Sequence, residues 1–91
     1  MIKNDNYIKF FKALANEERI EIIKLLKKNG EMFAQDIERH FYLEQSTTSH
    51  HLNMLKKAGI TKSRKDGRKV FYSIDINSIK LLLDSFDTVI F

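Results

Sequence analysis

The stretch that decides the fold reads Gln45-Ser-Thr-Thr-Ser-His-His-Leu-Asn-Met-Leu-Lys-Lys-Ala-Gly-Ile60, and Arg64-Lys-Asp-Gly-Arg-Lys-Val-Phe-Tyr-Ser-Ile74 follows it closely. Its first part predicts an amphipathic helix, because apolar and small side chains recur at helical spacing. We expect Ser46 to cap this helix and the Lys56-Lys57 pair to end it before Gly59. The inner face predicted by the spacing consists of Thr48, His51, Leu52, Leu55 and Ala58.

The second part changes from helical to alternating periodicity, which is typical of β-structure. Residues 60–65 and 69–74 are predicted to form two strands, because Val70, Tyr72 and Ile74 alternate with the residues between them. The Asp66-Gly67 pair that separates the strands is typical of a type I′ turn, whose two central residues have positive φ. Glycine adopts positive φ without a steric cost. The sequence therefore predicts a β-hairpin directly after the helix.

Three further helices are predicted before the deciding stretch. The second of them should run over residues 17–28, with Asn16 as its cap and Asn29-Gly30 at its end. The third covers residues 33–41, and a turn around residues 42–45 joins it to the helix of the deciding stretch. The first is predicted from an apolar face made of Tyr7, Phe10, Phe11 and Leu14.

A last helix is predicted after the hairpin, beginning near Asn77 or Ser78. The predicted order is therefore α-α-α-α-β-β-α, in a single domain over residues 1–91. A mainly α chain with a β-hairpin wing in this order is typical of a winged helix-turn-helix fold. The apolar face of the last helix consists of Ile79, Leu82, Leu83, Phe86, Val89 and Ile90.

Positive charge is concentrated in the predicted hairpin. The 91-residue chain has a net charge of +4, and five cations and one anion lie between Lys62 and Lys69. Such a patch is typical of a contact with a polyanion, although a solvated hairpin has the same composition. The chain has no cysteine, which excludes disulfides and thiolate metal sites. Its start is too polar for a signal peptide and no apolar run suits a membrane span, so we expect a cytoplasmic protein without membrane contact.

The deciding helix and the hairpin together predict a contact with double-stranded DNA. A recognition helix enters the major groove with its N-terminal end, where glutamine can pair with adenine edges and hydroxyls can bind bases or phosphates. Cations of the hairpin bind phosphates beside the groove. Capping alone explains Ser46, but not a cluster of outward hydroxyls beside His50. The predicted DNA-binding residues are Gln45, Ser46, Thr47, Thr48, Ser49, His50, His51, Arg64, Lys65, Arg68 and Lys69, with a largely structural role for His51.

Three stretches carry a resemblance to a known family: Phe11-Lys-Ala-Leu-Ala-Asn-Glu-Glu-Arg-Ile20, then 45–60, then 64–74. In this order and spacing, over residues 10–86, the chain resembles the ArsR/SmtB group of bacterial and archaeal repressors. The resemblance implies a homodimer built from the first and last helices, with two recognition helices about 34 Å apart on a pseudo-palindromic operator. The residues we expect at the dimer interface are Tyr7, Phe10, Phe11, Leu14, Leu82, Leu83, Phe86, Val89 and Ile90.

Members of this group commonly release DNA when they bind a metal or when cysteines oxidise, and this chain departs from both patterns. The positions that match the group's two cysteines on the third helix are Phe33 and Gln35. The last helix has Asp84 and Asp87 but no histidine, and two carboxylates without imidazole are a poor transition-metal site. We therefore expect no cofactor and no metal or thiol sensor. Constitutive action, control by abundance, and an unknown protein or small-molecule effector stay open.

Two other functional classes compete with a DNA-binding repressor. A winged-helix adaptor that binds protein instead of DNA has the same fold, but it does not need a cluster of cations beside a polar helix end. An enzyme is not expected, because the chain has no Gly-rich phosphate loop, no cysteine nucleophile and no cluster of metal ligands. The spacing of Ser49, His50 and Asp66 is not typical of a catalytic triad. DNA binding alone does not determine whether transcription is repressed or activated.

Overall fold

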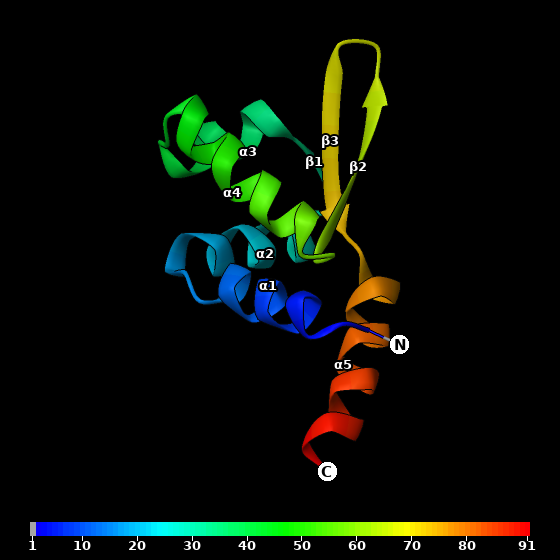
Figure 1. The fold of residues 1–91 in the computed structure, drawn as a ribbon. Coiled ribbons are helices and arrows are strands. Elements are labelled where there is room, and N and C mark those ends of the chain that lie inside the picture. Colours follow the sequence, from blue (N-terminus) through cyan, green and yellow to red (C-terminus); the bar gives the residue numbers. More distant parts are fainter. Residues whose placement is uncertain (1) are drawn as a thin grey trace.

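A computed structural model describes residues 2–91, which form five helices and three strands (Figure 1). The predicted winged helix-turn-helix order is confirmed, and one strand that the sequence did not predict precedes the third helix. The elements are α1 (Asn4–Leu14), α2 (Glu17–Asn29), β1 (Glu31–Phe33), α3 (Ala34–Phe41), α4 (Gln45–Lys57), β2 (Thr61–Asp66), β3 (Lys69–Ile74) and α5 (Ile76–Ile90).

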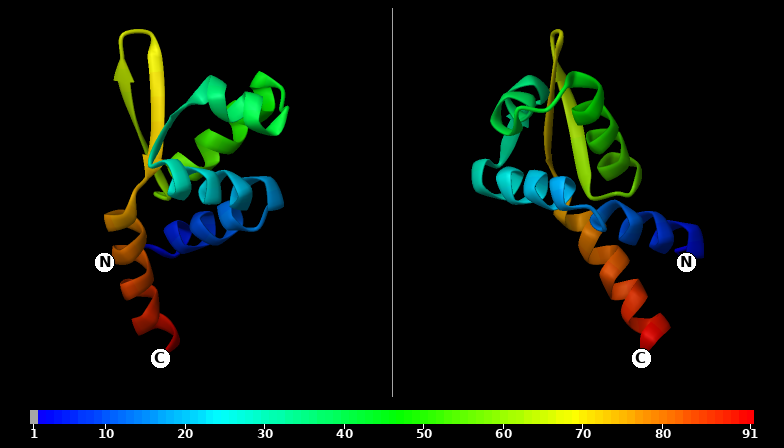
Figure 2. Two further views of the ribbon diagram at one scale, coloured as in Figure 1. Left: turned by 180° about the vertical axis from the view of Figure 1, so that it is seen from behind. Right: turned by 90° about the vertical axis from the view of Figure 1, so that its left-hand side faces the viewer.

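The wing and the last helix project from opposite ends of the molecule. Figures 1 and 2 show the β2–β3 hairpin extending away from the helical body while α5 extends in the other direction. The helix α1 packs against α5 through the rings of Tyr7 and Phe86, whose centroids are 5.1 Å apart. The helix α4 lies in the half of the molecule that carries the wing. The molecule is elongated as a result, with extents of 41 × 25 × 21 Å.

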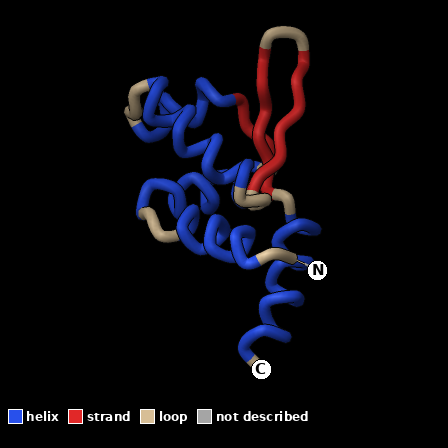
Figure 3. The backbone as a smooth tube through the Cα atoms, in the orientation of Figure 1, coloured by secondary structure: helices blue, strands red, loops and turns tan. Residues whose placement is uncertain are grey.

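The three strands form one antiparallel sheet in the order β1-β3-β2 (Figure 3). The strand β1 pairs with the base of the wing, with Glu31 opposite Ser73 and Phe33 opposite Phe71. A run of three residues is too short to show alternation in the sequence. Its pairing with β3 connects the start of the helix-turn-helix unit directly to the wing.

The turn at the tip of the wing differs from the prediction. Asp66 pairs with Lys69, so the two loop residues are Gly67 and Arg68 rather than Asp66 and Gly67. Gly67 has a φ of +63°, and Arg68 is not among the described residues with positive φ. Positive φ at the first loop residue alone is the pattern of a type II′ turn, which favours glycine there. Arg68 consequently lies at the outermost point of the hairpin.

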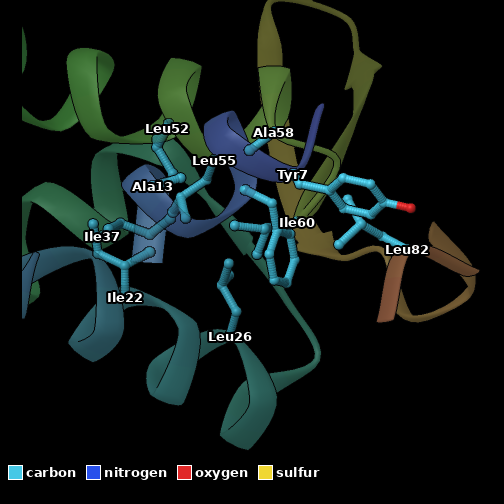
Figure 4. Close-up of a cluster of buried hydrophobic side chains, with 11 residues drawn as sticks. Tyr7, Ala13, Ile22, Leu26, Ile37, Leu52, Leu55, Ala58, Ile60 and Leu82 are labelled. Carbon is cyan, nitrogen blue, oxygen red and sulfur yellow. The ribbon is translucent and has the colours of Figure 1, made fainter. Parts of the chain in front are cut away.

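The core lies where the first four helices meet the base of the sheet, and Figure 4 shows its side chains converging. Ile22 and Leu26 of α2, Ile37 of α3 and Leu55 of α4 are fully buried, with 0% of each exposed. Burial of an aliphatic side chain of this size contributes about 1.5–3 kcal/mol. These contacts hold α4 against α2 and α3 and so determine which of its faces remains in solvent.

The N-terminal caps predicted for α2 and α4 can be compared with the structure. Asn16 caps α2 as predicted, because its Oδ1 accepts a hydrogen bond from the Arg19 backbone N–H at 3.0 Å. The cap predicted for α4 is wrong: the helix begins at Gln45, Glu44 occupies the cap position without a side-chain hydrogen bond, and Ser46 lies within the first turn. Ser46 is exposed and is not the capping residue. No helix within residues 2–91 is both long and apolar enough to cross a membrane.

Candidate nucleic-acid interface

The N-terminal half of α4 presents a polar surface to solvent. The side chains of Gln45, Ser46, Ser49 and His50 are exposed, and Thr47 is half-buried. The first turn of α4 contains no acidic residue, whereas α1, α2 and α3 each carry one or two there. The acid nearest this helix end is Glu44 at the cap position, and its side chain makes no capping hydrogen bond, so the side chain leaves the first amide groups of α4 open to a phosphate.

Two residues predicted to bind DNA lie on the other side of α4. Thr48 is 1% exposed and His51 is 6% exposed. Their side chains belong to the inner face that packs against the protein, so they cannot reach a base without a rearrangement of the helix. The structure therefore corrects the predicted set: the side chains of this segment that are accessible to solvent are the other five, Gln45, Ser46, Thr47, Ser49 and His50.

Around His51, the structure shows a buried polar network that the sequence did not predict. The ring Nδ1 lies 3.2 Å from Arg19 Nη1, and the ring Nε2 lies 2.7 Å from Glu18 Oε2. Arg19 also donates to the backbone oxygens of Ala13 and Lys12 at the end of α1, at 2.6 and 3.1 Å. The partners on α2 and α4 are more than thirty residues apart in sequence. Such long-range pairs leave no signal in local periodicity.

The wing places all four of the predicted cations in solvent. Arg64, Lys65, Arg68 and Lys69 are exposed, with Arg68 at the tip. Lys69 Nζ lies 5.3 Å from the centroid of the Phe33 ring, which leaves it on the face of the sheet that carries Phe33 and Phe71. Alternation along β2 places Lys65 on the opposite face from Arg64. The exposed cations therefore surround the outer end of the hairpin rather than one face of it.

Arg64 differs from the other wing cations because it already has a carboxylate partner. Its Nε and Nη2 donate to Glu31 of β1 at 2.8 and 2.6 Å, and its guanidinium lies 4.7 Å from the centroid of the Phe71 ring. The hydrogen bond from Arg64 lowers the pKa of Glu31 and raises that of Arg64. A two-point pair of this kind has a defined geometry. Arg64 thus connects β2 to β1 through its side chain.

The surface formed by α1 and α5 contains exposed apolar side chains next to the core. Phe11 packs on Phe86 with a centroid distance of 4.9 Å, yet it stays 40% exposed. Ile8 of α1 is 51% exposed and was not among the predicted interface residues. Three predicted interface residues, Tyr7, Phe10 and Leu82, are at most 6% exposed and belong to the core of the chain itself. Of the other predicted residues, Leu83, Val89 and Ile90 are exposed, and Leu14 and Phe86 are half-buried.

Within residues 2–91, no group of three or more histidine, aspartate or glutamate side chains is placed to hold a metal ion. Asp84 and Asp87 are both exposed on α5. Of the two residues predicted to match the group's cysteines, Phe33 is the last residue of β1 and packs on Phe71, and Gln35 is exposed in the first turn of α3.

The helix pair α3–α4, the sheet and the wing define a winged helix-turn-helix domain. Residues 16–63 match the family described as bacterial regulatory protein, arsR family, and the chain belongs to this family of transcriptional regulators. It is similar to the cadmium resistance transcriptional regulatory protein CadC homolog of Staphylococcus aureus, with 40% identity over 84% of this chain. The aligned part spans 63% of that relative's length. The transcriptional repressor SdpR of Bacillus subtilis is also 40% identical, over 71% of each chain.

The fold is likewise similar to solved structures of the family. One is the homodimeric winged helix-turn-helix DNA-binding domain of a Mycobacterium bovis protein, determined by NMR. The two structures superpose with a TM-score of 0.76 and 29% sequence identity, over 93% of this chain and 78% of that one.

Proposed function

We propose that this protein binds duplex DNA in a sequence-preferring manner as a homodimer and represses transcription. The observation that carries the proposal is the position of the polar end of α4 in the same half of the molecule as the basic wing. In winged helix-turn-helix proteins this pairing lets the helix read the major groove while the hairpin contacts flanking phosphates. Repression is supported by the similarity to SdpR, whose name describes a repressor.

Within this function, each group of exposed residues has its own role. Gln45 and Thr47 discriminate between bases, because amides and hydroxyls can match the hydrogen-bonding edges in the major groove. Ser46, Ser49 and His50 contact bases or the adjoining backbone. The cations Lys65, Arg68 and Lys69 bind phosphates and supply affinity that does not depend on sequence.

The dimer forms through α1 and α5. Apolar side chains exposed beside the core, foremost Ile8, Phe11, Leu83 and Ile90, would be buried by a second copy. A 91-residue chain buries a smaller fraction of its surface than a larger domain does, so additional burial stabilises it. The homodimeric state of the Mycobacterium bovis neighbour supports the same arrangement.

The protein acts without the metal or thiol sensors that are common in its family. The chain has no cysteine, and phenylalanine and glutamine occupy the two positions at which family members carry thiolates. The similarity to a protein named for cadmium resistance is therefore not accompanied by thiolates in this chain.

Selection of preferred duplexes from a random library tests the proposal, with the full chain immobilised and the selected sequences read by deep sequencing. We expect one enriched, pseudo-palindromic motif. Gln45→Ala and Thr47→Ala should each relax the preference at one base position per half-site, equivalent to about 1–3 kcal/mol of lost discrimination. Enrichment of no motif would contradict the proposal and favour a protein-binding adaptor.

A further inference from the structure

We infer that His51 positions the recognition helix only as a neutral imidazole with its proton on Nε2, and that protonation of this ring weakens binding to the preferred DNA site. The inference rests on the proposed DNA-binding function. His51 acts through the orientation of α4 and is a positioning residue, because its buried side chain is not available to the DNA.

The tautomer follows from the partners of the two ring nitrogens. Arginine has only hydrogen-bond donors, so Arg19 Nη1 must donate to His51 Nδ1 across their 3.2 Å contact. The ring Nδ1 therefore carries a lone pair and no proton. The proton of the neutral ring is then on Nε2, where it is donated to Glu18 Oε2 at 2.7 Å. One histidine thus accepts from the first partner and donates to the second.

The arginine in this network is held in place from three directions. Besides His51, it binds the carbonyl oxygens of Ala13 and Lys12, which belong to the end of α1. Arg19 is itself only 7% exposed. The position of the guanidinium is therefore determined by α1 and α2. The hydrogen bond to His51 in turn fixes α4 relative to these two helices. Loss of this bond would leave α4 without its polar connection to Arg19 and, through Arg19, to the end of α1, while the contact between the ring and Glu18 of α2 remained.

Protonation of His51 would place a second donor against Arg19. The Nδ1–H and the guanidinium N–H would then face each other at hydrogen-bonding distance, and two positive charges would be adjacent in a buried site. Glu18 would attract the charged ring, but its side chain is 52% exposed and its charge is screened by water. The attraction to Glu18 does not restore an acceptor at Nδ1, so the hydrogen bond from the buried Arg19 is lost on protonation.

Among the described residues, the ring makes its hydrogen bonds and its ion pair only with α2. The helix α1 contributes only the backbone oxygens held by Arg19, and the ring makes no hydrogen bond or ion pair with α3, β2 or β3. On α4 itself, the ring of His50 lies 5.9 Å away, centroid to centroid. His50 is exposed and faces the proposed groove, so its own protonation would strengthen contact with DNA and oppose the effect of His51.

The test therefore uses a background in which His51 is the sole histidine. The chain has three histidines, and a His40→Gln/His50→Gln double variant removes the other two. Its affinity for the selected duplex and for an unrelated duplex is measured by fluorescence anisotropy at constant ionic strength, at about pH 8 and about pH 5.5, either side of the range in which histidine titrates. We expect binding to the selected duplex to weaken about three- to tenfold at the lower pH, as for the loss of one hydrogen bond.

Binding to the unrelated duplex should not weaken at the lower pH, since it depends on cations rather than on the orientation of α4. Adding His51→Gln supplies the matched control, because glutamine can donate or accept at this position but cannot titrate. We expect the triple variant to lose the pH dependence. Equal pH dependence with and without His51, or none in the double variant, would overturn the inference while leaving the proposed function intact.

A second measurement needs no DNA and no substitution of His51. Nitrogen chemical shifts of the imidazole in the folded double variant report which ring nitrogen carries the proton. We expect Nε2 to be protonated and Nδ1 to be unprotonated at about pH 8. A proton on Nδ1 would overturn the inference even if the protein bound no DNA at all, whereas failure of every duplex to bind would overturn the proposed function.

Discussion

Two adjacent histidines on α4 show how one position along a helix decides a role. His50 is exposed, and His51 is 6% exposed and bound to Glu18 and Arg19. Successive residues on a helix point in directions about 100° apart, so the apolar periodicity of the sequence was sufficient to assign His51 to the inner face. The partners of His51 were not predictable, because they come from a helix more than thirty residues away.

Arg68 and Arg64 form a matched pair for testing the wing. If Arg68 contacts a phosphate, Arg68→Ala should reduce the slope of log affinity against log salt by about one unit. Arg64→Ala should change that slope much less, because its guanidinium is already neutralised by Glu31. Fluorescence anisotropy over a salt series measures both slopes. Equal reductions by the two variants would show that Arg64 leaves Glu31 to bind DNA.

Tyr42 offers a test of local strain in the helix-turn-helix. It lies between α3 and α4 with a φ of +55°, and its side chain is 95% exposed. A left-handed conformation costs a residue other than glycine about 1–2 kcal/mol, of which the greater chain entropy of glycine offsets a part. Tyr42→Gly should therefore raise the free energy of unfolding by about 0.5–1 kcal/mol, measured by urea denaturation. A lower stability would mean that the tyrosine side chain stabilises the turn.

At the scale of elements, the regular helices and the hairpin were predictable, whereas the connections between them were not. Asn16, Gly67 and the apolar faces gave correct helix and strand assignments because their signals are local. The sequence missed β1, whose three residues are defined by pairing with β3 about forty residues later. The predicted wing turn was one residue too early, and Ser46 was wrongly predicted as a cap. In both cases neighbouring residues have similar turn or cap propensities, so the sequence does not determine which of them takes the position.

The stabilisation provided by the ion pair between Glu31 of β1 and Arg64 of β2 should depend on pH. The hydrogen bond from Arg64 lowers the pKa of Glu31 below its ordinary value of 4.5. The contribution of this ion pair to the stability of the fold is therefore fully present above pH 4.5 and is lost as the pH falls through the lower pKa of Glu31 in the folded state. Carboxyl NMR titration of Glu31 measures the folded-state pKa. Arg64→Ala should return this pKa towards 4.5, and an unchanged titration would contradict the pairing.

At the scale of the whole molecule, the position of α5 relative to the wing determines how two copies would meet DNA. Because the wing and α5 project in opposite directions, a dimer formed through α1 and α5 leaves both wings free. The sequence indicated these helices as the interface from their apolar content. It could not separate residues of the chain's own core, such as Phe10, from exposed ones such as Ile8, because both have the same composition signal.

Leu83→Asp tests this arrangement, with Leu81→Asp as its control. Both leucines are exposed on α5, at 45% and 66%, but two residues apart on a helix they point to nearly opposite sides. Leu83→Asp should give a folded monomer in sedimentation velocity that has lost tight binding to the selected duplex. Leu81→Asp should remain dimeric. A dimeric, fully active Leu83→Asp variant would remove this face of α5 from the interface.

Sequence-preferring DNA recognition is tested most directly by binding to the DNA upstream of the protein's own gene. Fluorescence anisotropy is measured at two salt concentrations against an unrelated duplex, with chelator and with added divalent metals. We expect a dimer to bind the upstream duplex tightly and in preference to the unrelated one, with an affinity that falls with salt and does not respond to metal. Equal affinity for both duplexes, or no binding to either, would contradict sequence-preferring DNA recognition, and release by metal would contradict a regulator without a metal sensor.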